Sequence, residues 1–183
     1  MKQEINIVWY KRDLRVDDHA PLREATSAGI AVLPLYVVEP EYWRQKFASR
    51  RHWQFISDCL NELRQHTQSL GQPLIIRLGE VEAVFDTLRR DYAIRGIYAH
   101  EECGNHWTYQ RDKAVIRWCQ RNQIPLHEYP YNAVVRRLNN RDHWARLRNI
   151  RMTEELIAKP EKILPVADIT EGDIPSIDHP MFG

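Results

Sequence analysis

Short apolar runs alternate with amphipathic segments of helical period over the first 130 residues, and this alternation is the feature that most restricts the fold. The runs are rich in β-branched side chains, which is typical of strands buried on both faces. Apolar residues in the segments between them recur at steps of three and four, as in amphipathic helices. We therefore predict an α/β fold, an open five-stranded parallel sheet with helices on both faces. The predicted strands cover residues 5–10, 31–38, 74–78, 96–99 and 125–129.

The predicted helices also indicate where the α/β pattern stops. Ser49 caps the longest helix and Gly71 ends it. The alternation fails near residue 130, and beyond it we predict one short helix, around Trp144, followed by an irregular segment with prolines and acidic residues. We therefore divide the chain into an α/β domain, residues 1–135, and a linker with a short helix, residues 136–183. We expect the linker to lead into a further domain.

The composition narrows the class of protein. At 183 residues, with 43% hydrophobic and 28% charged residues, the chain suits one soluble domain. A formal net charge of +1 argues against binding nucleic acid through bulk charge. Apolar runs fall well short of the roughly 20 residues that span a bilayer, and the N-terminus lacks a signal-peptide core. Three widely spaced cysteines do not form a disulfide framework, and we expect Cys59 and Cys119 in the core. These features favour a cytoplasmic protein without a membrane partner.

The first strand ends in a charged loop, Lys11–Arg15, which leads into the first helix. Ligands of open α/β sheets bind beyond the carboxyl ends of the strands. This loop is therefore the first candidate for function. Its charged side chains could form the polar wall of a pocket, or ion pairs that only hold loops together, and the sequence leaves both interpretations open.

A longer motif contains this loop. The chain resembles DNA photolyases and cryptochromes, whose N-terminal signature is similar to the run Trp9-Tyr10-Lys11-Arg12-Asp13-Leu14-Arg15-Val16-Asp17-Asp18-His19. Gly79-Glu80, after the third strand, matches the family in order and spacing. So does the segment after the fourth strand, which runs from His100-Glu101-Glu102 to Arg111-Asp112. One departure is Asp18-His19, where the family often carries Asn and Pro.

The resemblance covers roughly Ile5 to Ile150 and implies the Rossmann-like N-terminal domain of that family. Such a domain holds a light-harvesting antenna pigment: a reduced folate, a deazaflavin or FMN. FAD belongs to a helical domain further along a longer chain, so we expect a fragment whose partner is its own FAD domain, with damaged DNA bound through that domain. The parent protein would repair pyrimidine dimers with light, or, as a cryptochrome, would signal blue light. A stand-alone nucleotide-binding domain is the third choice.

The expected pigment-binding residues follow three strands or begin the long helix. Backbone N–H groups at a helix start and nearby arginines can bind an anion or a carbonyl, and carboxylates or amides beyond the fourth strand would complete the pocket. The alternative for each is an ion pair or a helix cap. The candidates are Arg12, Asp13, Leu14, Val38, Glu39, Arg50, Arg51, Glu101, Glu102 and Asn105.

Other patterns carry less weight. His100, Cys103 and His106 have the spacing of metal ligands, but structural zinc requires a fourth ligand, so no metal is expected. No nucleophile–base pair is evident, so we expect no catalytic residue and no repair activity from this chain alone.

A basic block around Trp144 could bind nucleic acid or pack against the FAD domain, and we favour packing. It comprises Arg136, Arg137, Arg141, Arg146, Arg148 and Arg151.

Overall fold

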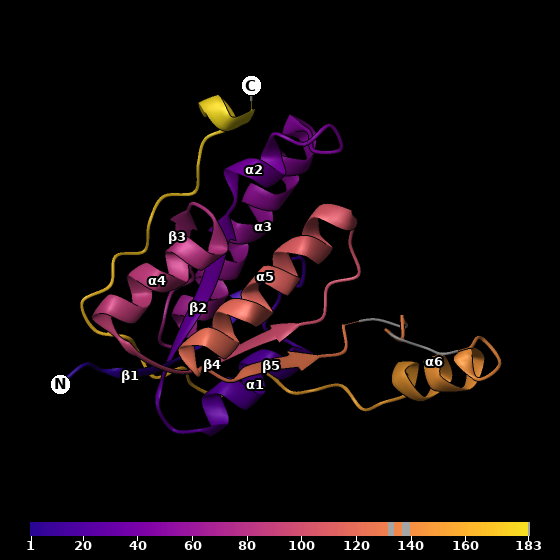
Figure 1. The fold of residues 1–183 in the computed structure, drawn as a ribbon. Coiled ribbons are helices and arrows are strands. Elements are labelled where there is room, and N and C mark those ends of the chain that lie inside the picture. The colour runs from indigo at the N-terminus through magenta and orange to yellow at the C-terminus, as the bar shows by residue number, and fades with distance from the viewer. Residues whose placement is uncertain (132–133, 137–139, 183) are drawn as a thin grey trace.

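A computed structural model describes residues 1–131, 134–136 and 140–182 of the chain. Its centre is a five-stranded, all-parallel sheet, which confirms the predicted fold class (Figure 1). The strand order is β3-β2-β1-β4-β5, so the direction of winding reverses between β1 and β4. The strands are β1 (Glu4–Tyr10), β2 (Ala31–Val38), β3 (Ile75–Leu78), β4 (Ala93–His100) and β5 (Leu126–Tyr129).

Helices cover both faces of the sheet, because the alternate side chains of the central strands are apolar on both sides. One core cluster packs α4 (Val81–Asp91) and α5 (His106–Asn122) against the sheet. The other packs α1 (Ala20–Ser27), the one-turn α2 (Pro40–Trp43) and α3 (Arg50–Ser69) on the opposite face. The side chain of Ser49 caps α3, as predicted, by accepting a hydrogen bond from the backbone N–H of His52. Among the described helices, none is long and apolar enough to cross a membrane.

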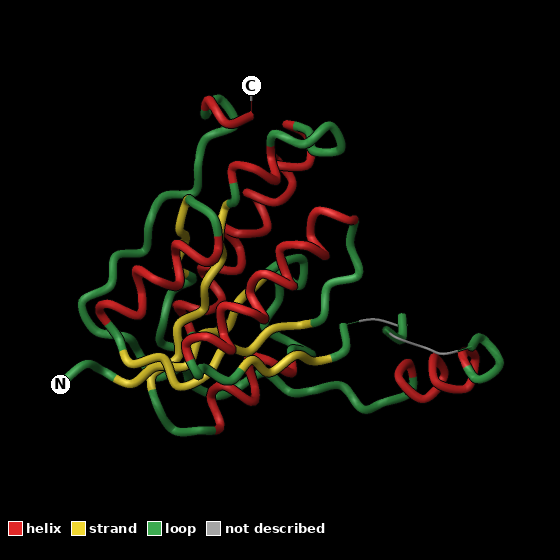
Figure 2. The backbone as a smooth tube through the Cα atoms, in the orientation of Figure 1, coloured by secondary structure: helices red, strands yellow, loops and turns green. Residues whose placement is uncertain are grey.

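The C-terminal segment, residues 162–182, lies along the α/β body as an extended strap (Figure 2). It passes the β3 edge of the sheet, where the N–H of Ile76 donates to the carbonyl of Glu171 at 2.7 Å. Further on, Trp53 Nε1 donates to the carbonyl of Pro175, and the short 3₁₀ helix η1 (Pro180–Phe182) stacks Phe182 on the Trp53 ring. The segment lacks the apolar periodicity of a helix, as expected, yet it is anchored to the α/β body at both ends.

Helix α6 (Trp144–Met152) is the short helix predicted beyond the sheet, and it projects away from the α/β body (Figure 1). Its described side chains are all at least partly exposed, and Trp144 and Ile150 are 43% and 49% exposed. Arg137, one of the basic block, lies outside the described residues. The division of the chain at residue 135 stays a prediction.

Candidate functional site

A pocket of about 880 Å³ lies where β1 and β2 end, beside the reversal of strand order between β1 and β4. The loop after β1 forms its floor together with the last residues of β2, and the first turns of α3 form one side. The start of α5 closes the opposite side through Asn105 and Arg111. Ligands of open α/β sheets bind at such a reversal point, beyond the carboxyl ends of the strands.

One wall of the pocket is apolar and comes from α3 and the loop before it. His52, Phe55, Ile56 and Cys59 line it at steps of three, one and three residues, so they form one face of the helix. Phe55 is 71% exposed, and Phe47, which also lines the pocket, is 42% exposed. Large aromatic side chains exposed inside a concave surface provide a flat apolar platform for a planar ligand.

The opposite wall is charged and is built around Arg111. This guanidinium contacts three carboxylates: Glu39 at 2.8 Å, Asp112 at 2.9 Å, and Glu102. It also lies 5.0 Å from the ring centroid of Trp9, in a cation–π contact. Such a cluster fixes the guanidinium and carboxylates in one arrangement before any ligand arrives.

Two more cations complete this charged wall. Lys11 Nζ lies 3.5 Å from Asp112 Oδ2, and Arg12 Nε donates to Glu102 Oε1 at 2.9 Å. The side chain of Arg12 remains 51% exposed at the rim. The wall is therefore close to neutral overall, because each cation is paired with a carboxylate, and Arg12 lies at its exposed rim.

Burial changes the proton affinities of these groups. Burial alone would lower the pKa of Arg111, but the three carboxylates around it raise that pKa above its usual value. Burial raises the pKa of Glu39 to about 7, although the Arg111 guanidinium opposes the change. Burial also raises the pKa of Tyr36, which lines the pocket beside Glu39. Arg111 therefore stays charged, whereas Glu39 changes protonation near neutral pH.

The structure brings six of the ten sequence-predicted residues to this pocket. The other four lie elsewhere. Val38 is buried in the core, and Arg50 donates to the carbonyl of Phe182. Glu101 lies 3.9 Å from Arg136, and Asp13 belongs to the buried hub described below. Pigment contacts of all ten stay predictions; those that line the pocket are Arg12, Leu14, Glu39, Arg51, Glu102 and Asn105.

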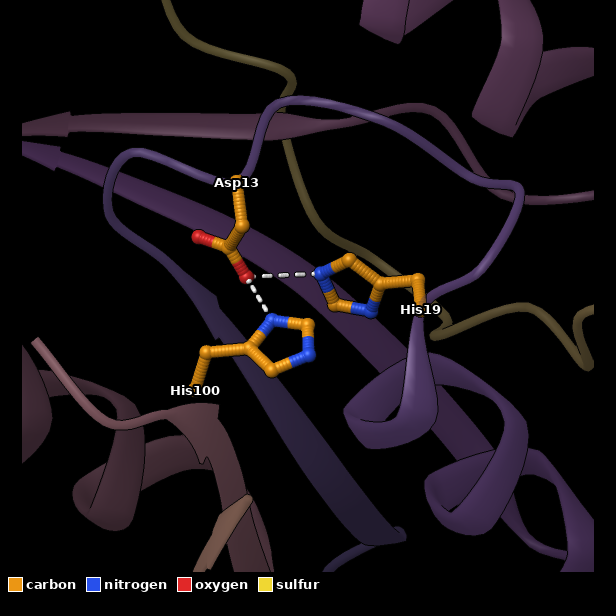
Figure 3. Close-up of side chains that lie close together, drawn as sticks. All are labelled: Asp13, His19 and His100. Atoms are coloured by element: carbon orange, nitrogen blue, oxygen red, sulfur yellow. Dashed lines mark hydrogen bonds and ion pairs between the residues drawn. The ribbon is translucent and has the colours of Figure 1, made fainter. Parts of the chain in front are cut away.

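Asp13 is the centre of a buried hydrogen-bonded hub with His19 and His100 (Figure 3). Its Oδ2 is 2.8 Å from His19 Nε2 and 2.6 Å from His100 Nδ1, and its Oδ1 accepts from the N–H of Lys11 at 3.0 Å. Burial would raise the pKa of Asp13, but the hydrogen bonds from His100 and His19 hold it well below its usual range. This carboxylate therefore ties the loop after β1 to the end of β4.

The hydrogen bonds of His19 argue against a metal at this hub. Its Nδ1 accepts the N–H of Leu22 and caps α1, so its proton is on Nε2 and points at Asp13. A metal on Nε2 would displace that proton, and the proton normally retained on Nδ1 would then face another N–H. Among the described residues, Asp13, His19 and His100 are the one group of potential ligands within 4.8 Å of one another. Cys103 and His106 are outside it.

Sequence reasoning missed the apolar wall and the central role of Arg111. Cys59 was expected in the core, but it is partly exposed and lines the pocket, because the apolar face of α3 is wider than its core contact. The signal for the wall was the pair Phe55 and Ile56 beside the core position Trp53. The expectation that Cys119 is buried in the core is confirmed.

Comparison with known proteins identifies the family. The DNA photolyase family model matches residues 6–142. The chain belongs to this family. A cryptochrome DASH of Solanum lycopersicum is 34% identical over 104 residues, which cover 54% of this chain and 18% of the relative. The blue-light photoreceptor PHR2 of Arabidopsis thaliana is 33% identical over 101 residues, 52% of this chain and 23% of that protein. The matched part of this photolyase-family chain therefore spans about a fifth of these relatives.

Solved structures share the fold. A Synechocystis cryptochrome superposes with a TM-score of 0.78 at 20% identity, over 93% of this chain and 38% of that one. A class III photolyase from Agrobacterium tumefaciens gives a TM-score of 0.76 at 16% identity, over 94% and 37% of the two chains. An archaeal photolyase from Sulfolobus tokodaii, described with two FAD molecules and a novel light-harvesting cofactor, gives 0.68 at 21% identity, over 88% and 38%.

Proposed function

We propose that this chain is the light-harvesting N-terminal domain of a photolyase or cryptochrome, and that the pocket binds its antenna pigment. The observation that carries the proposal is the pocket itself, which has the volume of a cofactor site, an apolar aromatic wall and a preformed charged wall. A reduced folate, a deazaflavin and FMN all combine a planar ring with a polar edge. The two walls fit that combination.

The chain's own residues would hold and orient the pigment. Phe55 and Ile56 would pack on the ring face, Glu39 and Arg111 would meet its polar edge, and Arg12 or Arg51 at the rim would bind an anionic tail. The bound pigment would supply light absorption and pass excitation to FAD in the helical domain of the parent protein. Fixed position and exclusion of water are the contributions of this domain.

Between the two family activities we favour light-driven repair of pyrimidine dimers, through a deoxyribodipyrimidine photolyase activity of the parent protein, because the matching family model is that of DNA photolyases. Cryptochrome signalling is the alternative, and the names of the curated relatives favour it. The residues that separate the two activities belong to the FAD domain. A stand-alone nucleotide-binding domain ranks third, because the sequence lacks a glycine-rich phosphate loop.

The partner that we propose for this chain is the FAD domain of its parent protein. The exposed apolar side chains on and after α6, among them Trp144, Ile150 and Leu156, suit packing against the parent's FAD domain better than contact with DNA. Damaged DNA would bind through that FAD domain. We also propose a cytoplasmic location, on the basis of the cysteine usage and composition.

A binding titration tests the proposal. The purified chain is titrated separately with a reduced folate, an 8-hydroxy-5-deazaflavin and FMN, and absorption and fluorescence are recorded. We expect one of them to bind and to show a shifted band. Phe55→Ala should weaken binding by up to about tenfold, since an aromatic contact contributes about 0.5–1.5 kcal/mol.

A matched control distinguishes the loss of an aromatic side chain in the pocket from the loss of one elsewhere on the surface. Tyr109→Ala removes another exposed aromatic side chain, 51% exposed on α5 and outside the pocket, and should leave binding unchanged. If none of the three pigments binds, or if both variants weaken binding equally, the pocket is not the pigment site.

A further inference from the structure

Two side chains of the pocket keep a buried polar atom without a partner among the described residues. They are Glu39, through Oε1, and Tyr10, through its hydroxyl. Glu39 is 5% exposed and Tyr10 is 1% exposed. Buried polar atoms in folded proteins are nearly always hydrogen-bonded, so two in one pocket require an explanation.

The surroundings of Glu39 do not supply that partner. Arg111 occupies the other carboxylate oxygen, Oε2, at 2.8 Å. Glu80 and Glu102 also act on Glu39, but they are acidic and cannot donate when ionised. The Tyr36 hydroxyl lies nearby and could donate, but it makes no hydrogen bond to Oε1. The Glu39 carboxylate is thus held through Oε2 by Arg111, while its buried Oε1 has no donor among the described residues.

We infer that Glu39 determines the specificity of the pocket by accepting a hydrogen bond from a ring N–H of the ligand. The ligand class is a heterocycle with a cyclic amide or imide, in which an N–H lies beside a carbonyl. The apolar wall receives the ring face. This inference rests on the proposed function, because it names the chemical group by which the pocket recognises its pigment.

The protonation state of Glu39 predicts the direction in which ligand affinity changes with pH. Only an ionised carboxylate accepts a ring N–H at the oxygen left free by Arg111, and burial raises the pKa of Glu39 to about 7. Ligand binding must therefore release a proton below that pH, so affinity should rise between pH 6 and pH 8. His52, a second ionisable side chain, also lines the pocket, so the pH profile is read against a Glu39 variant.

The deciding experiment compares each pigment with its N3-methylated form, for example FMN with 3-methyl-FMN, in fluorescence titrations of the 183-residue chain. Methylation removes the donor and should weaken binding to the wild type at least tenfold. In Glu39→Gln the side-chain carbonyl must face the Arg111 guanidinium, so its NH₂ group meets the ligand. The variant has the same shape but no acceptor, so the preference for the N–H form should fall below about threefold, and the rise of affinity with pH should shrink.

Two further variants control for packing and local charge. Tyr10→Phe removes the other buried polar atom without a partner and should keep the preference for the N–H form, because Glu39, the acceptor, is unchanged. Glu41→Gln removes an exposed carboxylate two residues away, outside the pocket, and should keep the full preference. Thermal unfolding of each variant confirms that it is folded.

The outcomes separate the two proposals. If a pigment binds and Glu39→Gln retains a tenfold preference for the N–H form, this inference is wrong and the proposed function stands. Affinity that falls as the pH rises from 6 to 8 would also overturn it, because Glu39 would then donate a proton to a carbonyl. If no pigment binds in either form, the proposed function is wrong and this inference falls with it.

Discussion

Replacing Asp13 with Asn should destabilise the chain strongly, although the two side chains have nearly the same shape. The carboxylate accepts three buried hydrogen bonds, from the Lys11 N–H, His19 and His100. An Asn has one acceptor oxygen and one NH₂ group. Whichever way it is turned, at least one buried N–H therefore faces another donor.

The magnitude follows from these contacts. Leaving one buried donor unsatisfied costs about 1–3 kcal/mol, and the remaining bonds lose the strength that a charged acceptor gives them. We expect the free energy of unfolding to fall by about 3 kcal/mol. For a chain of this size that corresponds to a melting temperature lower by roughly 6–12 °C.

Urea unfolding, followed by tryptophan fluorescence and circular dichroism, measures this change. Glu41→Gln is the control, because it removes one charge from an exposed ion pair with Arg44 and should change stability by less than about 0.5 kcal/mol. A loss for Asp13→Asn below about 1 kcal/mol would refute the view that the hub holds the loop.

The pH dependence provides an independent check on Asp13. Its pKa is lowered by folding, so its contribution is complete above the unfolded-state pKa of about 4 and is lost as the pH falls through the folded-state pKa. The difference in stability between wild type and Asp13→Asn should therefore narrow below about pH 4. A difference that stays constant under acid would mean that the charge of Asp13 is not what stabilises the hub.

Three further predictions concern other parts of the molecule. Burial lowers the pKa of His19, so below about pH 6.5 the unfolded chain binds a proton that the folded chain does not. The free energy of unfolding should therefore fall from pH 7 to pH 5. In His19→Asn, urea unfolding should show a weaker dependence of this free energy on pH. Gly172 has a φ of +75°, and a Cβ there would lie 2.1 Å from the carbonyl oxygen of Ile76, so Gly172→Ala should lose about 2 kcal/mol or more and expose the strap to proteases. Gly29→Ala, at a φ of +69° with nothing within 4 Å, should lose only about 1 kcal/mol, and equal losses would contradict the role of the strap. Arg111→Lys should cost about 2–4 kcal/mol by leaving a buried carboxylate unpaired, whereas Arg121→Lys in the exposed pair with Glu82 should be nearly neutral in thermal unfolding.

The fold was predictable because the apolar residues of each strand identify it without reference to the rest of the chain. Buried strands of a parallel sheet must be apolar on both faces, and the run Ala31–Val38 satisfies this at all eight positions. The strand order was harder to predict, because the apolar runs look alike and nothing local tells β4 to pair with β1 rather than β3. That choice depends on packing between residues far apart in sequence.

The site residues that directly follow a strand were predictable from the sequence, because all strands of a parallel sheet run in one direction. Glu39 and Glu102 lie just beyond the ends of β2 and β4, and parallel strands bring such residues to one edge of the sheet. The α3 wall was not predictable by that reasoning. Ile56 shares the period of the core residues of α3 and Phe55 does not, and only the tertiary structure shows that this face of the helix lines a pocket.

Asp13 shows that the sequence of a charged motif does not reveal which residue lines the pocket and which is buried. Arg12 and Asp13 are adjacent in the loop, yet Arg12 lines the pocket and Asp13 joins the buried hub. The deciding partner is His100, which is 87 residues away in sequence and reaches Asp13 because β4 pairs with β1. Since the hub also holds the backbone N–H of Lys11, it fixes the loop that forms the charged wall. Asp13→Asn should therefore weaken pigment binding as well as stability, without Asp13 touching the pigment. If binding is unchanged in the folded variant, the loop keeps its geometry without the hub.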